Sequence, residues 1–556
     1  MENAPMDKLD AKTRTIGSLL AHEFFFRVPE YQRPFSWDAD NFDDLIDDVL
    51  SANKSEDYFL GTIVLHHRMP EGHFDIVDGQ QRITSLMILL ACLRDLVQDQ
   101  QYKAGIQAKI LQQKNVVDGI PEKVRLEVKD RQLFHEIVVI QEGTAVERNE
   151  SGMPEPERRY VSAVSAFRSK LKELQQPEVQ KTIEFLNQRC VVTYFASSSF
   201  AAAFKLFTIV NDRGKQLRRI DILKAINIAP DVITKETVRN KIAQQWEEFE
   251  KGLGESTFES VFHLVRLVLL KDKPQGDLLK EFEVRVFKSN DKNVRVAKGE
   301  PFFNLVFEYA KLYSSIFIDR DVVPEEKPEH NKYRALIHIM NAEFGASEWR
   351  ACLLYFARQF KGKLFYEFCL RMEKVYLAQW VRGIRKDERY AAYSKILALI
   401  ESSKKPEDVL AGVVYDADAI SNATQAKDLY SVGFGRYFLL RMELVAAEHD
   451  TIHEFDAKSV EHVLPQEPEP VGYWADHHKL EQIRDYVDKI GNLVLLSKGK
   501  NSAARNFDFP KKKEKYLKNR VSDYPRSVQV LNYPDWERKT IEERTAEAKT
   551  LILQDP

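Results

Sequence analysis

Short apolar runs in the first part of the chain predict β-strands. They lie at residues 24–29 (FFFRVP), 59–67 (FLGTIVLHH), 73–79 (HFDIVDG) and 190–196 (CVVTYFA). These runs are rich in aromatic and β-branched residues, which suit the pleated, half-buried environment of a sheet. The third run ends at Asp78-Gly79, a dipeptide typical of turns.

Helical periodicity alternates with these runs. In residues 81–96 the apolar side chains of Ile83, Leu86, Met87 and Leu90 recur at the spacing of one helix face. A second stretch with helical spacing, residues 217–227, follows a turn at residues 211–214 (NDRG). The first part of the chain is therefore predicted to be α/β or α+β.

From about residue 236 to residue 445 the strand pattern disappears and long amphipathic segments predict helices only. A last helix is predicted at residues 435–449, before a segment that again contains strand-like runs. We therefore predict an α+β multidomain chain with domains at residues 1–235, 236–430 and 431–556.

Composition narrows the class of protein. A chain of 556 residues is too long for one hydrophobic core, and 44% hydrophobic with 30% charged residues is typical of soluble globular proteins. The sequence has no apolar stretch of membrane-spanning length and no signal-peptide profile at residues 1–10, which predicts a soluble cytoplasmic protein without a membrane partner. The four cysteines form no CxxC pair, so we interpret them as buried apolar residues.

The net charge of −3 does not indicate nucleic-acid binding, but the charge distribution does. Residues 496–520 contain nine lysines and arginines against Asp508 and Glu514. Such a basic stretch is typical of a DNA-contacting surface. A solvated charged face is the alternative, and the stretch taken alone favours that alternative.

The chemistry-bearing residues cluster near this stretch. Residues 459–466 (SVEHVLPQ), 490–507 and 511–516 predict a strand, a loop, a second strand and a helix. Hydrolysis of a phosphodiester needs an activated water and a cation that stabilises the leaving oxygen. His462 is the candidate base, Glu461 and Asn501 are candidate metal ligands, and Asn492 is a candidate for orienting the imidazole.

A histidine beside a glutamate is more often structural than catalytic, so the wider pattern matters. The run Glu-His-x-x-Pro-Gln, an Asn-bearing strand and a further Asn nine residues later resemble the HNH (ββα-metal) nucleases. That resemblance implies a ββα-metal fold and an Mg²⁺ or Mn²⁺ ion. Glu461 stands where the acidic residue is commonly Asp, which changes the reach of that ligand. The lysines expected to contact the DNA backbone are Lys511, Lys512, Lys513 and Lys515.

Two motifs mark the first part of the chain: VPEYQRPFSW at residues 28–37 and DGQQR at Asp78, Gly79, Gln80, Gln81 and Arg82. A Gly turn followed by amides and an arginine at the start of a helix suits a phosphate or nucleotide. A turn with a polar helix cap is the alternative for DGQQR alone. The chain has no GxxxxGK[ST] motif, which argues against a P-loop NTPase.

Together with residues 207–225 (FTIVNDRGKQLRRIDILKA), these motifs resemble the N-terminal domain of the GmrSD family, which has a ParB-like fold. The resemblance implies a single-chain type IV restriction enzyme with NTPase activity that defends bacteria by cutting modified phage DNA, for example DNA with hydroxymethylated or glucosylated cytosine. It assigns the DGQQR residues to ATP or GTP. Tyr31, Gln32 and Arg33 match a run associated with sensing of modified DNA.

The resulting hypothesis is an NTP-regulated, divalent-metal-dependent endonuclease that acts on double-stranded modified phage DNA, with a homodimer as a further expectation. A nucleotide-dependent DNA-binding sensor with an inactive HNH domain is the alternative from another class. A nonspecific nuclease toxin whose N-terminal domain only gates cutting is the third reading.

Overall fold

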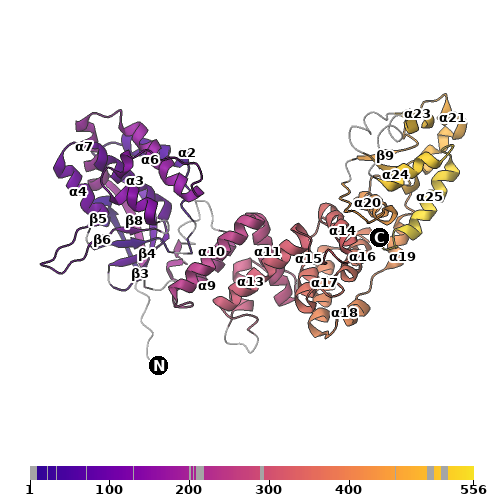
Figure 1. Cartoon of the computed structure of the whole chain (residues 1–556), viewed down its shortest axis with the longest axis horizontal. Coiled ribbons are helices and arrows are strands. Elements are labelled where there is room, and N and C mark those ends of the chain that lie inside the picture. Colours follow the sequence, from indigo (N-terminus) through magenta and orange to yellow (C-terminus); the bar gives the residue numbers. More distant parts are fainter. Residues whose placement is uncertain are drawn as a thin grey trace. The chain divides into compact units, whose positions relative to one another are not determined.

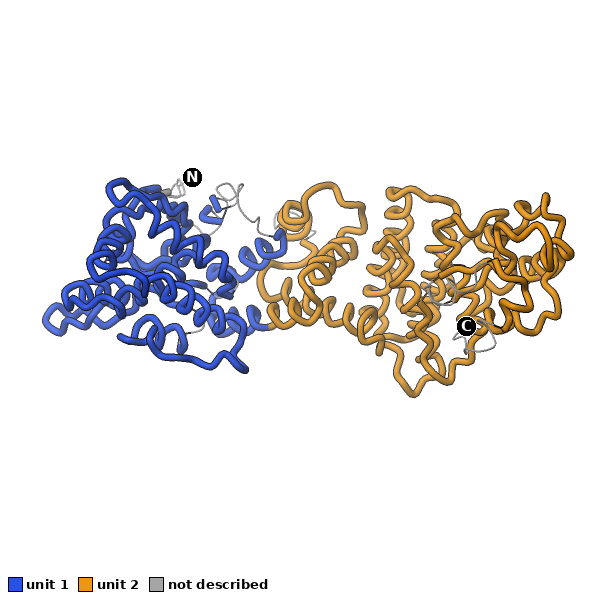
Figure 2. Tube along the Cα trace, turned by 90° about the horizontal axis from the view of Figure 1, so that it is seen from above, with its two compact units in different colours: residues 1–244 blue, residues 245–556 orange. Residues whose placement is uncertain are grey.

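The computed structural model describes residues 9–556 apart from residues 22, 30, 33, 71, 129–130, 199–201, 205, 208–217, 289–293, 457–458, 497–505 and 515–523. The chain folds as two compact units, residues 1–244 and residues 245–556 (Figure 2). The boundary falls inside helix α10 (Glu236–Leu253). The three-domain division at residues 235 and 430 stays a prediction.

The first unit is built on a mixed six-stranded sheet with the strand order β1-β8-β3-β4-β2-β7. Its strands are β1 (Leu9–Thr15), β2 (Phe25–Arg27), β3 (Tyr58–Arg68), β4 (His73–Asp78), β7 (Leu126–Glu127) and β8 (Cys190–Ser197). The four predicted strands are thus β2, β3, β4 and β8. Strands β3 and β8 pair in parallel, and β4 runs antiparallel to β3.

Helices pack against this sheet (Figure 1). The helices of the first unit are α1 (Ile16–Leu19), α2 (Ala39–Ser51), α3 (Gln80–Leu96), α4 (Gln100–Ile110), α5 (Arg131–Phe134), α6 (Glu155–Leu171), α7 (Gln176–Gln188) and α9 (Arg219–Ile228). Alternate residues of β8, such as Val192 and Tyr194, join the apolar residues of α3, α6 and α7 in one core. A two-stranded sheet, β5 (Leu111–Gln112) with β6 (Lys123–Val124), completes the unit.

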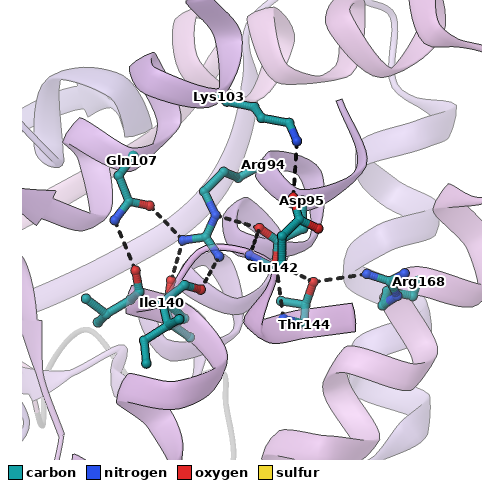
Figure 3. A network of polar contacts seen from close by, with 10 residues as sticks. Arg94, Asp95, Lys103, Gln107, Ile140, Glu142, Thr144 and Arg168 are labelled. Atoms are coloured by element: carbon teal, nitrogen blue, oxygen red, sulfur yellow. Dashed lines mark hydrogen bonds and ion pairs between the residues drawn. The ribbon is translucent and has the colours of Figure 1, made fainter. Parts of the chain in front are cut away.

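A buried polar network fixes the C-terminal end of α3 (Figure 3). Arg94 donates to Gln107 Oε1 and to the carbonyl of Val138, both at 2.7 Å, and to Asp95 Oδ1 at 2.7 Å. Asp95 in turn accepts from the Thr144 hydroxyl at 2.7 Å. The Arg94 and Asp95 side chains are each 1% exposed, so the ion pair is desolvated and well bonded. The network holds in place the helix whose other end carries the DGQQR motif.

The described part of residues 236–446 forms helices and turns without a β-strand, as the periodicity predicts. These helices after α10 are α11 (Glu255–Leu270), α12 (Leu278–Glu281), α13 (Glu300–Tyr313), α14 (His330–Glu343), α15 (Glu348–Phe360), α16 (Phe365–Val381), α17 (Lys386–Ser402), α18 (Pro406–Gly412), α19 (Ala417–Ala423) and α20 (Gly435–Ala446). Two of the four buried cysteines, Cys352 and Cys369, lie in this region, and all four are buried free thiols as expected.

The last part of the second unit contains a two-stranded antiparallel sheet. Its elements are β9 (Ser459–His462), α21 (Tyr473–His477), β10 (Leu493–Leu496), α23 (Phe509–Lys512), α24 (Pro525–Gln529) and α25 (Arg538–Leu551). A small core that includes Val494, Trp474, Phe509 and Trp536 lies beside the sheet. In the described part of the chain, no helix is long and apolar enough to span a bilayer.

Candidate functional site

Strands β9 and β10 place the Glu461–His462 pair at the end of a short ladder. His462 pairs with Leu493 and Glu461 pairs with Val494. All four residues of β10 are buried, so the register of the ladder is set by the apolar core beside it. Because successive residues of a strand point to opposite sides, the two side chains have different partners.

Asn492 fixes the loop that follows β9. Its Oδ1 accepts from the Leu464 backbone at 2.8 Å and from Trp536 Nε1 at 3.0 Å. Its Nδ2 donates to the carbonyls of Leu464 and Val487, at 2.9 and 2.7 Å. These four hydrogen bonds use the whole capacity of the amide. Asn492 therefore orients the loop backbone and does not bond to the imidazole of His462. The imidazole is oriented by another residue.

That residue is Asp488, which the sequence reading did not single out. His462 Nε2 donates to Asp488 Oδ1 at 2.8 Å, and Gln466 Nε2 donates to the same oxygen at 2.8 Å. The ring of Tyr430 packs on the imidazole with 4.5 Å between ring centroids. Asp488 thus fixes the tautomer with a proton on Nε2, which leaves Nδ1 with the lone pair that accepts a proton.

The environment keeps His462 in the neutral form. Burial lowers the pKa of His462 below its ordinary value, although the hydrogen bond to Asp488 and the Asp488 charge act in the opposite direction. A neutral imidazole oriented by a carboxylate is able to act as a general base near pH 7.

Glu461, the expected metal ligand, forms an ion pair with a lysine in this structure. Lys512 Nζ donates to Glu461 Oε1 and to the His462 carbonyl, both at 2.8 Å. The side chains of Lys512 and Glu461 are 1% and 8% exposed. Burial lowers the pKa of Lys512, and the Glu461 charge opposes that shift. The pair holds the end of β9 against α23.

The basic run therefore does not present one uniform surface. Lys512 faces inward, because it follows the fully buried Phe509 by three residues on α23. Its expected contact with the DNA backbone conflicts with this burial. Lys511 is exposed and lies over the Phe507 ring, and half-buried Lys513 donates to the Tyr533 carbonyl at 2.6 Å. Lys515 lies outside the described residues.

The nearby histidines have structural contacts. His478 is buried between the Tyr486 hydroxyl at 3.0 Å and the Trp536 carbonyl at 2.8 Å. His477 bonds to the Tyr473 carbonyl at 2.8 Å. Trp474 is a residue of the small core beside the sheet.

The second predicted site lies where β4 meets α3 in the first unit. Gly79 starts the helix with φ 91°, and a Cβ at this position would lie 2.5 Å from Ile63 Cγ2, so only glycine fits without a shift. Asp78 and Gln80 flank it at the strand end and the first helical position. Burial raises the pKa of Asp78, opposed by the Gly79 backbone N–H and the Arg82 charge.

The two motifs of the first unit form one structure. Gln81 Oε1 accepts from the backbone of Ser36 at 2.8 Å, and Gln32 Nε2 donates to the Val77 carbonyl at 2.7 Å. Gln81 therefore holds the first motif, and Gln32 holds the end of β4 just before the second. The cavity between them has a volume of only about 20 Å³, room for one water molecule, so it does not hold a nucleotide. A nucleotide would have to bind outside this cavity.

Arg82 lies on the sheet side of α3. Its Nη1 donates to the Thr62 carbonyl at 3.2 Å, next to Gly61, and burial lowers its pKa. Tyr31 is 7% exposed, so its ring is part of the packed loop. Arg33, the third residue of the predicted sensing run, lies outside the described residues.

Comparison with known families matches two separate stretches of the chain, one around each candidate site. Residues 15–228 match the model for the N-terminal domain of the GmrSD restriction endonuclease, and residues 415–548 match the model for the C-terminal domain of these enzymes. The chain belongs to the GmrSD family of restriction endonucleases. No curated protein matches its sequence. The DGQQR residues lie in the first matched stretch of this GmrSD chain, and the His462–Asp488 pair lies in the second.

The site residues of the GmrSD chain do not by themselves show a metal centre. Asn501, the second predicted ligand, lies outside the described residues, and Glu461 pairs with Lys512. Among the residues that the structure describes, no group of three or more His, Cys, Asp or Glu side chains is placed to hold a metal ion.

Proposed function

We propose that this GmrSD-family chain is an endonuclease that hydrolyses phosphodiester bonds, with His462 as the base that activates water. The hydrogen bond between His462 and Asp488 carries the proposal, because it fixes one tautomer of the imidazole, whose neutral form burial favours. In this mechanism Nδ1 takes the proton of the attacking water while Asp488 stabilises the imidazolium that forms.

The HNH-type assignment also rests on the order of elements. A strand with the Glu461–His462 pair and an antiparallel second strand support this assignment, although α21 lies in the connection between them. We propose that cutting depends on Mg²⁺ or Mn²⁺, as the resemblance implies. In this proposal Glu461 and Asn501 are the metal ligands, and Asn501 lies outside the described residues.

We further propose that the substrate is double-stranded phage DNA with modified bases, such as hydroxymethylated or glucosylated cytosine, and that ATP or GTP regulates cutting in the cytoplasm of a bacterium. The α3 N-terminus and the DGQQR run support a phosphate-binding role there. Because the inner cavity is too small, the triphosphate would contact the outer side of the motif.

The decisive experiment compares wild type with His462→Ala on a panel of modified and unmodified phage genomes, with and without NTP and with Mg²⁺, Mn²⁺ or a chelator. Loss of cutting by about 10²-fold or more is expected for His462→Ala. His135→Ala, which changes an exposed histidine in the first unit, is the matched control. Equal cutting by wild type and His462→Ala would refute the catalytic assignment.

One observation favours a second function. In the buried Glu461–Lys512 ion pair, a lysine occupies the place where the resemblance implies a metal ion. This suits a nucleotide-dependent DNA-binding sensor with an inactive HNH domain. That alternative predicts DNA binding without nicking under every metal condition of the same experiment.

A further inference from the structure

A cleft of about 970 Å³ lies in the helical part of the second unit. It is lined where α14, α16 and α18 begin and where α15 and α17 end (helices labelled in Figure 1). All of its lining residues fall between positions 322 and 407, outside both stretches that match the GmrSD models. No function is assigned to this part of the chain by the family comparison.

The cleft is rich in lysine. Three inter-helix segments contribute exposed lysines to it: Lys327, Lys361, Lys363, Lys404 and Lys405. None of these five ammonium groups makes an ion pair with a carboxylate in the described part of the chain, whereas Lys271 and Lys273 in the same unit pair with Glu401 and Asp387. Three glutamates also line the cleft, so its side chains carry a net charge of +2, from five lysines less three glutamates.

The backbone presents two of these lysines from an uncommon turn. Lys361 and Leu364 have φ angles of 53° and 52°, and Gly362 between them has 75°. Two non-glycine residues in the left-handed region cost of order 1 kcal/mol or more each. The turn joins α15 to α16 and directs a Lys-Gly-Lys segment along the cleft lining.

Helix ends of both polarities meet at this cleft. Helices α14 and α16 both begin at the cleft, and neither has an N-cap side chain that accepts from its first-turn N–H groups. Their positive dipole ends favour anions, whereas the negative ends of α15 and α17 at the same cleft oppose them. The excess positive charge of the cleft therefore comes from its lysines. The aromatic residues that line the cleft, Phe360, Phe365 and Tyr366, are buried. The lining therefore offers phosphate contacts without an exposed ring on which a base could stack.

We infer that this cleft binds the phosphate backbone of DNA and so extends the DNA path beyond the nuclease motif. The choice of DNA as the polyanion rests on the proposed function. Flexible lysines bind phosphates as point charges and read no sequence, so this contact supplies affinity and not selectivity. A free nucleoside triphosphate shares the phosphate chemistry, but the lining has no exposed surface for its base.

The test measures binding of a labelled DNA duplex to the full chain by fluorescence anisotropy across a salt series, with a chelator present to prevent cutting. The variant K361Q/K363Q/K404Q/K405Q removes four of the lysines. Each lost phosphate contact should reduce the magnitude of the negative slope of log K against log salt by about 0.9, so the slope should become less negative by roughly 2 to 4. The control K251Q/K280Q/K311Q/K386Q changes four exposed lysines of the same unit outside the cleft and should leave the slope unchanged.

The outcomes separate this inference from the proposed function. A wild type that binds DNA and a cleft variant with the same slope and the same melting temperature would overturn the inference alone. The His462→Ala cleavage assay decides the nuclease independently, because it measures chemistry and not affinity. A cleft variant that loses binding of labelled ATP or GTP while keeping its DNA slope would identify a free nucleotide and also overturn the inference. Absence of DNA binding by wild type would overturn the inference, and the cleavage assay would still decide the nuclease.

Discussion

The Nε2 atom of His462 lies 2.8 Å from Oδ1 of Asp488, 26 residues further along the chain. The bond joins the last residue of β9 to the turn before β10, and Gln466 donates to the same carboxylate. It therefore couples the orientation of the imidazole to the loop that Asn492 holds.

Replacement of Asp488 by Asn should slow DNA cutting by about 10²-fold or more, because the tautomer of His462 is no longer fixed by a carboxylate. The same change should move the acidic limb of the pH–rate profile to lower pH. Asp488 raises the pKa of His462 against the larger effect of burial, so its removal lets the pKa fall further. Cleavage rates measured across pH check both effects.

Asp485→Asn is the matched control, since this exposed aspartate lies three residues away and pairs with Lys427 at 2.7 Å. It should cut as fast as wild type. A normal rate and an unshifted profile for Asp488→Asn would show that the dyad has no role in catalysis.

Lys512→Met should lower the melting temperature strongly. It leaves the buried Glu461 carboxylate without its lysine partner, and breaking a buried pair by removing one member costs about 3–5 kcal/mol. Lys511→Met, on the exposed neighbour, should leave the melting temperature unchanged. If Lys512→Met instead weakened DNA binding at an unaltered melting temperature, Lys512 would be a DNA contact after all.

The apolar runs were sufficient to predict β2, β3, β4, β8 and the long helix α3. Strand β1 was missed because its sequence, LDAKTRT, is largely polar. It is an edge strand whose order comes from pairing with β8 and not from an apolar face of its own.

Contacts between distant segments also limited the prediction of the candidate site. The sequence pattern pointed to Glu461, His462 and Asn492, but the partners of their side chains depend on contacts across the fold. Asp488 carries no motif, because only the folding of the loop brings it to the imidazole. The inward direction of Lys512 had one usable signal, its spacing of three residues from the apolar Phe509.

Arg82→Ala should weaken triphosphate hydrolysis more than it weakens metal binding, if the DGQQR run holds the nucleotide. Loss of the guanidinium removes a phosphate contact at the start of α3. Release of inorganic phosphate measures the effect, and Arg189→Ala, on an exposed arginine of the same unit, is the control. Because Arg82 also donates to the Thr62 carbonyl, a melting curve must show that the Arg82→Ala protein is still folded. Unchanged phosphate release in a folded Arg82→Ala protein would refute the assignment.

Glu443 on α20 should make the second unit less stable as pH rises. Its side chain is 2% exposed, and Glu443 Oε2 accepts from the Arg526 backbone N–H at 2.7 Å. Burial raises the pKa of Glu443 from 4.5 to about 7 in the folded chain. The folded state therefore binds this proton more tightly than the unfolded state, so the stabilisation is complete below pH 4.5 and is lost as pH rises through 7.

Gln resembles the protonated carboxyl and keeps an oxygen that accepts from Arg526, so Glu443→Gln should melt at a higher temperature than wild type at about pH 8 and close to it at about pH 5. Scanning calorimetry across this range measures the difference, with Glu469→Gln on an exposed glutamate as the control. Parallel pH profiles for wild type and Glu443→Gln would mean that Glu443 has the same proton affinity in the folded and unfolded chains.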